Sequence, residues 1–197
     1  MKLGIMGGTF DPIHLGHLAA AENARYYLNL DLVLFMLSAQ PPHKDNQIVS
    51  PAHHRLRMVE MAIADNPCFK VSTLEMERQG ASYTVDTLKE LKQKLDNPDI
   101  YFLMGSDSLF DLVNWYHYEE IASLCTLVSI SRPGFANEEA FASVPIAIRK
   151  KTITLEVPGL EVSSTELKRR LQSGEPVRYL LPEAVASYIE EQGLYDK

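Results

Sequence analysis

The chain has 197 residues and a mass of 22.2 kDa, which suits one domain or one domain with a small extension. Hydrophobic residues make up 46% and charged residues 23%, close to the average of soluble globular proteins, so disorder, collagen and coiled coil are disfavoured. The net charge of −7 argues against a nucleic-acid partner, because contact with many phosphates needs a basic face. A small anion needs only a local pocket.

Cysteine usage and the apolar runs indicate the compartment. Cys68 and Cys125 lie far apart and outside any Cys-x-x-Cys pair, and such sparse cysteines suit a reducing environment. The longest apolar run, residues 32–37, is too short to cross a bilayer, and the first residues lack the apolar stretch of a signal peptide. We therefore expect a cytoplasmic protein without a membrane partner.

Short apolar runs alternate along the chain with amphipathic segments. Strands are predicted at residues 3–6, 32–38, 69–72, 100–104, 126–130 and 153–157. Helices are predicted after a Ser50 cap with Pro51 at the first position, and at residues 18–28, 85–95, 163–171 and 182–192. This alternation predicts an α/β fold, a Rossmann-like, doubly wound parallel sheet with helices on both faces.

Turn-forming residues mark a boundary near the end of the chain. Gly174 opens a stretch that also contains Pro176 and Pro182. We expect a main domain over residues 1–173 and a small C-terminal helical extension over residues 174–197 that packs on the same domain.

Polar clusters that contain glycine, proline or serine follow five of the predicted strands. They begin at Gly7, Pro41, Gly105, Ser131 and Val162. Because the carboxyl ends of parallel strands share one edge, these clusters would face one crevice. The plainer alternative is that loops are simply polar, but ordinary loops need no His, Lys and Arg placed in this way.

The first cluster has the chemistry of an anion site. Gly7 and Gly8 allow a ligand to approach the backbone, and a helix that starts near Gly16 offers free N–H groups. His14 and His17 would share a helical face and can donate hydrogen bonds to a phosphate. A zinc pair and a pair of capping histidines are the alternatives. The loop matches neither the P-loop nor the dinucleotide-binding glycine pattern.

The last cluster predicts a second anion site. Ser163, Ser164 and Thr165 can cap a helix while they present hydroxyl and N–H groups, and Lys168 and Arg169 lie in the next turn. The alternative is a solvated basic helix face. Taken with the first cluster, the more economical interpretation is that both hold one polyphosphate.

Two further residues have competing interpretations. Asp107 follows a glycine at a strand end, where its carboxylate could accept bonds from ribose hydroxyls or could cap a helix. Trp115 lies in the densest aromatic stretch of the chain, where core packing is the default role.

Gly-Gly-Thr-Phe-Asp-Pro-Ile-His-x-Gly-His at residues 7–17, with Ser-Ser-Thr-x-Leu-Lys at 163–168, resembles the nucleotidylyltransferase superfamily. Further matches include Ser82-Tyr83-Thr84, Gly105-Ser106-Asp107-Ser108 and Trp115-Tyr116. With them the chain looks like the bacterial nicotinate-nucleotide adenylyltransferase family over nearly its whole length.

The resemblance implies a reaction between ATP and nicotinate mononucleotide. The products would be nicotinate adenine dinucleotide (deamido-NAD) and pyrophosphate, in NAD biosynthesis. A direct in-line attack without a covalent intermediate is consistent with the residues, and Mg²⁺ would be carried with ATP. The sequence leaves the oligomeric state open, with a homodimer as one option.

The resemblance also assigns site residues. The implied catalytic residues are His14, His17 and Lys168, with His17 nearest the α-phosphorus. The implied ATP-binding residues are Gly8, Thr9, Phe10, Gly16, Gly105, Asp107, Arg132, Ser163, Ser164 and Thr165. The implied mononucleotide-binding residues are His43, Lys44, Thr84, Trp115 and Tyr116, with Trp115 stacked on the pyridine ring.

One residue departs from the family pattern. Lys168 stands where the family usually has Arg, so the charge is kept and the bidentate fork is lost; Arg169 could substitute, although it points about 100° away around a helix.

Four rival functions remain: a nicotinamide-preferring enzyme, a phosphopantetheine adenylyltransferase, a fragment of a class I aminoacyl-tRNA synthetase and a non-catalytic nucleotide sensor. The phosphopantetheine enzyme usually has Thr where His14 stands.

Overall fold

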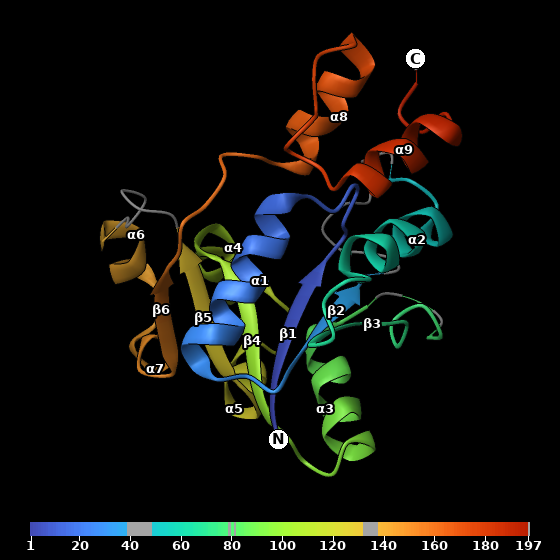
Figure 1. Ribbon diagram of the computed structural model, residues 1–197. Coiled ribbons are helices and arrows are strands. Elements are labelled where there is room, and N and C mark those ends of the chain that lie inside the picture. Colours follow the sequence, from blue (N-terminus) through green and yellow to red (C-terminus); the bar gives the residue numbers. More distant parts are fainter. Residues whose placement is uncertain (39–48, 79, 81, 132–137, 197) are drawn as a thin grey trace.

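The computed structural model describes residues 1–38, 49–78, 80, 82–131 and 138–196, and within them lies one six-stranded parallel sheet (Figure 1). The strands are β1 (Lys2–Gly8), β2 (Leu32–Leu37), β3 (Phe69–Ser72), β4 (Asp99–Gly105), β5 (Thr126–Ser131) and β6 (Thr152–Glu156). Their order is β3-β2-β1-β4-β5-β6, so the strand order reverses between β1 and β4. The predicted doubly wound α/β fold is confirmed.

The central strands consist of consecutive apolar residues because both faces of the sheet are covered. In β2 all residues from 33 to 37 are buried. Leu3 of β1 pairs with Leu32 of β2 and Ile100 of β4, and this register places the carboxyl ends of the strands along one edge. The six predicted strands lie within two residues of these bounds.

Two hydrophobic cores lie on opposite faces of the sheet. One contains Ala21 of α1 (Leu15–Leu28) and Met58 of α2 (Ala52–Ile63). The other contains Leu88 of α3 (Thr84–Lys94), Leu109 of α4 (Ser106–Asp111) and Ile121 of α5 (Tyr118–Leu124). The sheet is therefore a layer between helices, and the loops at its carboxyl edge are left free to form a site.

The helix predictions need one correction and several additions. Ser50 does not cap α2: Pro51 occupies the N-cap position, and no side chain makes a cap hydrogen bond there. The structure also contains helices that the sequence pattern does not predict: α4, α5, a 3-10 helix at Leu112–Asn114, α6 (Glu138–Ser143) and α7 (Ile146–Arg149). These elements are too short to show a repeating apolar stripe.

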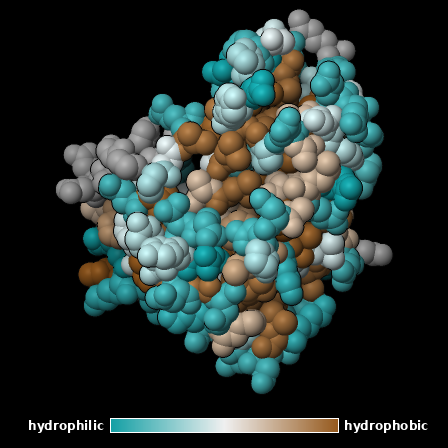
Figure 2. All heavy atoms as spheres, viewed as in Figure 1, coloured by the Kyte–Doolittle hydropathy of each residue, from teal (hydrophilic) through white to brown (hydrophobic). Residues whose placement is uncertain are grey.

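The C-terminal helices stand at the carboxyl edge of the sheet, beyond the tips of the strand arrows (Figure 1). They are α8 (Ser164–Ser173), which Gly174 terminates at φ 67°, and α9 (Glu183–Glu191). Val185 and Ile189 of α9 are buried in the core that α1 and α2 cover. Figure 2 shows hydrophobic residues gathered in the upper middle of this face, below α8. Among the described helices, none combines the length and apolarity of a membrane span.

Candidate active site

A cavity of about 1010 Å³ opens at the carboxyl edge of the sheet, at the point where the strand order reverses. Its walls come from the loops after β1 and β4, the end of β5, the start of α3 and the start of α8. Three of the five predicted clusters therefore meet at one cavity, together with Ser131, the one described residue of a fourth. The fifth, which begins at Pro41, lies outside the described residues, as do His43, Lys44 and Arg132.

The loop between β1 and α1 is tightly packed against its own side chains. A Cβ on Gly8 would lie 2.8 Å from the Phe10 ring, and a Cβ on Gly16 would lie 3.0 Å from Nδ1 of His14. Phe10, an implied ATP contact, is buried under the loop, and its ring meets that of His17 edge-on at 5.2 Å. It supports the loop from within, whereas Gly8, Thr9 and Gly16 line the cavity.

The two predicted histidines lie side by side in the cavity wall. Their rings stack with centroids 3.7 Å apart. The backbone N–H of His14 donates to Nδ1 of His17 at 3.3 Å, so a neutral His17 carries its proton on Nε2. Burial lowers the pKa of His14 to about 4, and burial together with the neighbouring His14 holds the pKa of His17 well below its usual value. Both rings are therefore neutral at pH 7.

The structure bears differently on the two alternatives for these histidines. Within the described ranges, no three His, Cys, Asp or Glu side chains are grouped so that they could hold a metal ion. The capping alternative holds in part: His14 occupies the N-cap position of α1, and its N–H donates to the ring of His17 at N3, as in a capping box. Nδ1 of the buried His14 ring nonetheless has no hydrogen-bond partner. A buried, neutral imidazole with one unpaired ring nitrogen beside a cavity is typical of a residue that binds a ligand.

The two predicted anion clusters lie next to each other in the cavity wall. Oγ of Ser164 donates to the carbonyl oxygen of Pro12 at 2.9 Å, across a sequence separation of 152 residues. Ser163 caps α8, because its Oγ accepts the N–H of Glu166 at 3.2 Å. Ser163, Ser164 and Thr165 all line the cavity. The expected proximity of the two segments is confirmed.

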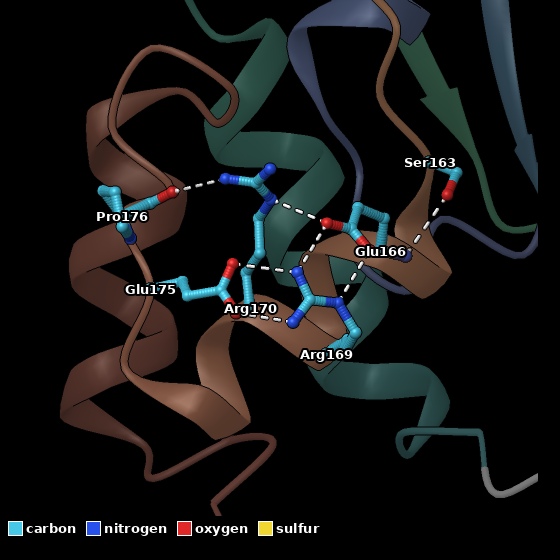
Figure 3. Close-up of polar contacts among 6 residues, drawn as sticks. All are labelled: Ser163, Glu166, Arg169, Arg170, Glu175 and Pro176. Atoms are coloured by element: carbon cyan, nitrogen blue, oxygen red, sulfur yellow. Dashed lines mark hydrogen bonds and ion pairs between the residues drawn. The ribbon is translucent and has the colours of Figure 1, made fainter.

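The basic residues of α8 are held by different partners. Nζ of Lys168 lies 3.0 Å from Oδ2 of Asp11, and Lys168 is not among the residues that line the cavity. The guanidinium of Arg169 donates to the carboxylates of Glu166 and Glu175 (Figure 3), and Arg169 does not line the cavity either. Arg169 is therefore not placed to substitute for Lys168.

The loop after β4 forms another part of the wall. Gly105 is the N-cap of α4, so the alternative that Asp107 caps this helix is wrong. Asp107 lies exposed in the first turn of α4 and lines the cavity. No atom lies within 4 Å of a Cβ built on Gly105, which leaves open space beside the backbone there.

Aromatic rings line the end of the cavity near α3. Trp115 is half-buried, and its ring meets that of Phe102 edge-on at 6.1 Å. Tyr116 is 53% exposed and packs against Tyr83 with ring centroids 4.6 Å apart. Trp115 and Tyr116 line the cavity together with Thr84, the first residue of α3. Trp115 therefore combines core packing with a face toward the cavity.

Several known proteins are similar to this chain over most or all of its length. The cytidylyltransferase-like family matches residues 5–170. A protein of Thermus thermophilus named probable nicotinate-nucleotide adenylyltransferase is 46% identical and covers 99% of this chain and 100% of its own. The nicotinate-nucleotide adenylyltransferase of Bacillus subtilis is 42% identical, with 99% and 98% covered. The chain belongs to the nicotinate-nucleotide adenylyltransferase family.

Solved structures agree on the fold of this family member. Plasmodium falciparum nicotinic acid mononucleotide adenylyltransferase complexed with NaAD superimposes with a TM-score of 0.80. The two sequences are 22% identical, and the match covers 98% of this chain and 97% of the other. At 22% sequence identity this similarity supports the shared fold alone.

Sequence reasoning missed a buried arginine that shapes the site of this family member. Arg55 of α2 is 2% exposed, and its guanidinium donates to the carbonyl oxygens of Thr9, Ser38 and Ser50, each at 2.8 Å. It thereby ties the ends of β1 and β2 to the start of α2. The signal in the sequence was the position of Arg55 next to the apolar stripe of α2. An arginine at such a position is partly or fully buried and needs hydrogen-bond partners.

A buried carboxyl in the cavity wall was also missed. Glu75 is 6% exposed, and one of its carboxyl oxygens accepts the hydroxyl of Thr87 at 2.8 Å. Burial raises the pKa of Glu75, although the bond from Thr87 and the charge of Arg78 oppose this shift. The signal in the sequence was an acidic residue between the apolar Leu74 and Met76, after the third strand.

Proposed function

We propose that the protein transfers the adenylyl group of ATP to nicotinate mononucleotide, giving nicotinate adenine dinucleotide (deamido-NAD) and pyrophosphate in NAD biosynthesis. One observation carries this proposal: the His-x-Gly-His loop and the Ser-Ser-Thr turn line one cavity, in a chain 42–46% identical to nicotinate-nucleotide adenylyltransferases over almost its full length. The protein is an enzyme of the nucleotidyltransferase class.

The triphosphate of ATP would lie between the β1–α1 loop and the start of α8. Both elements present helix N-terminal N–H groups, and the hydroxyls of Ser164 and Thr165 line the same wall. His14 and His17 are neutral donors, and a bound phosphate would raise the pKa of each ring. The two imidazoles would thus gain positive charge where the reaction develops negative charge.

The chemical step would be an in-line displacement at the α-phosphorus. An oxygen of the mononucleotide 5′-phosphate forms the new P–O bond, and the bond to the bridging oxygen of the β-phosphate breaks as pyrophosphate leaves. The nucleophile is already an anion, so no strong general base is required. The protein aligns the two phosphates and stabilises charge on the α-phosphate oxygens and the leaving group.

Mg²⁺ would arrive with ATP. The described cavity wall carries two carboxylates, Glu75 and Asp107, which belong to different segments and form no grouped metal site. This donor set suits a Mg²⁺ ion held mainly by phosphate oxygens and water. The ion would neutralise phosphate charge, while the residues of this chain orient the nucleotide.

The two nucleosides would occupy the other walls. Adenosine would lie against Gly105, where the backbone faces open space, with its ribose near the carboxylate of Asp107 and Arg132 as a further ATP contact. The pyridine ring would stack on Trp115, and Thr84 with the backbone of Tyr116 would bind its carboxylate. His43 and Lys44 are proposed as further mononucleotide contacts.

Pyrophosphate release from ATP tests the proposal. The purified protein is incubated with MgATP and with nicotinate mononucleotide, its amide analogue or no acceptor. We expect rapid release with the acid and much slower release with the amide. A preference for the amide would reassign the substrate, and tight ATP binding without release in any arm would indicate a nucleotide sensor.

A further inference from the structure

Asp11 connects four segments that are far apart in the sequence. Its carboxylate, with a side-chain exposure of 4%, accepts hydrogen bonds from the N–H of Ser50 at 3.3 Å, Nζ of Lys168 at 3.0 Å and the hydroxyl of Tyr195 at 2.7 Å. Burial by itself raises the pKa of Asp11, but the bonds from Tyr195, Ser50 and Lys168 outweigh it and lower the pKa below its usual value. Asp11 is therefore an anion at pH 7.

The place of Asp11 in the chain gives these bonds a functional setting. Asp11 lies between Thr9 and His14, both of which line the cavity, and next to Pro12, which accepts the hydroxyl of Ser164. Lys168 lies one helical turn beyond Ser164 in α8, and its side chain is 26% exposed. The Asp11–Lys168 pair therefore stands behind the proposed triphosphate site, with the lysine still reachable from solvent.

The two carboxylate oxygens of Asp11 have different partners. Oδ1 receives the hydroxyl of Tyr195, while Oδ2 receives Lys168 and Ser50. Tyr195 comes from the segment after α9, at a sequence separation of 184 residues, and packs against the core under α1 and α2. Without that hydroxyl, a buried carboxylate oxygen would lose the donor from Tyr195, and the carboxylate would turn toward its partners on Oδ2, among them Lys168.

We propose that Tyr195 is a positioning residue for ATP binding: by holding one oxygen of Asp11, it fixes the carboxylate so that Lys168 is directed to the triphosphate. This inference rests on the proposed function, to which it adds a contact between the triphosphate and Lys168, the catalytic residue that the family resemblance implies on α8. The C-terminal segment would then help to position the group that binds the triphosphate, in addition to packing on α2.

The test is a double-mutant cycle on the affinity for a non-hydrolysable ATP analogue with its Mg²⁺. Tyr195→Phe removes only the hydroxyl and should weaken the affinity several-fold, up to about tenfold. Tyr188→Phe is the matched control, because it removes another hydrogen-bonded hydroxyl, 2.8 Å from Nδ1 of His54, from the same C-terminal segment. It should leave the affinity unchanged.

The Lys168→Ala background separates positioning from packing. If Tyr195 acts through Lys168, the Tyr195→Phe change has no further effect on affinity in that background. Additive losses, or an equal loss in Tyr188→Phe, would overturn the proposal. Turnover of the wild-type protein with nicotinate mononucleotide is measured separately, so a failure of the proposed function is seen there and does not affect the binding cycle.

Asp11→Asn provides a second measurement if Tyr195→Phe destabilises the fold. Asparagine keeps the size of the side chain and an acceptor for Tyr195, and removes the charge that holds Lys168. Under the proposal this variant binds the analogue more weakly, because Lys168 is no longer directed. Tighter binding would show that Asp11 merely masks Lys168, and would overturn the assignment of Tyr195.

Discussion

The phosphate end and the aromatic end of the cavity are held together in different ways. At the phosphate end, a hydrogen bond from Ser164 to Pro12 and the ion pair of buried Asp11 with partly exposed Lys168 join segments that are more than 150 residues apart. At the aromatic end, Trp115 and Tyr116 are held by ring contacts and remain half-buried or exposed. The difference fits the chemistry, because charge development needs donors fixed in advance and a flat ring needs only a surface to stack on.

The largest effect is expected at the phosphate end, from His17→Ala. The substitution removes a donor beside the proposed α-phosphate position and should lower kcat by a factor of roughly 10² or more. Pyrophosphate release under saturating substrates measures it, with the melting temperature as the check on folding. Near-normal turnover would remove His17 from the mechanism and would leave the phosphate end as a binding element only.

Trp115→Ala probes the aromatic end and should act on one substrate. Loss of a stacking surface corresponds to roughly 1 kcal/mol, so KM for the mononucleotide should rise about fivefold to tenfold, while KM for ATP stays almost constant. Initial rates with each substrate varied in turn give both constants. Equal damage to both KM values would show that Trp115 acts through packing on Phe102 and that the two ends are coupled.

Gly16→Ala tests how rigid the phosphate end is. The new Cβ would lie 3.0 Å from Nδ1 of His14 and 3.1 Å from Cγ1 of Val162, so a shift of a few tenths of an ångström is required. We expect kcat to fall several-fold, because small misplacements of aligned groups slow the reaction. Gly105→Ala is the stability control: its Cβ meets nothing within 4 Å, and its melting temperature should match the wild type. An unaltered kcat in Gly16→Ala would show that the loop adapts.

The sequence predicted the parts of the site that follow local rules. Strand runs, the glycine-rich loop with His14 and His17, and the Ser163 cap each depend on residues close together in the chain. Arg55, Glu75 and Tyr195 were not recognised, because each acts through partners that only the folded chain brings near, such as Thr9 for Arg55 and Asp11 for Tyr195. For Lys168, likewise, the sequence shows a charge in the next turn of α8 but not its partner Asp11.

The smallest effect concerns the pH dependence of stability at the phosphate end. Burial lowers the pKa of His14 to about 4 in the folded protein, below the ordinary value of 6.5. Between these two values the unfolded chain binds a proton that the folded chain does not. The contribution of neutral His14 to the free energy of unfolding is therefore fully present above pH 6.5 and is lost as the pH drops toward 4. From pH 7 to pH 6 the loss from this one group is less than about 1 kcal/mol, or a few degrees in melting temperature.

His14→Gln should therefore flatten the dependence of the melting temperature on pH between pH 7 and pH 5 relative to the wild type. A non-hydrolysable ATP analogue should flatten the wild-type profile as well, because a phosphate beside the rings raises the pKa of His14 toward its unfolded value. If the analogue stabilises the protein equally at pH 7 and pH 5, no proton is taken up on binding. The neutral ring would then act only as a hydrogen-bond donor, and the charge at the phosphate end would have to come from other groups, such as Lys168.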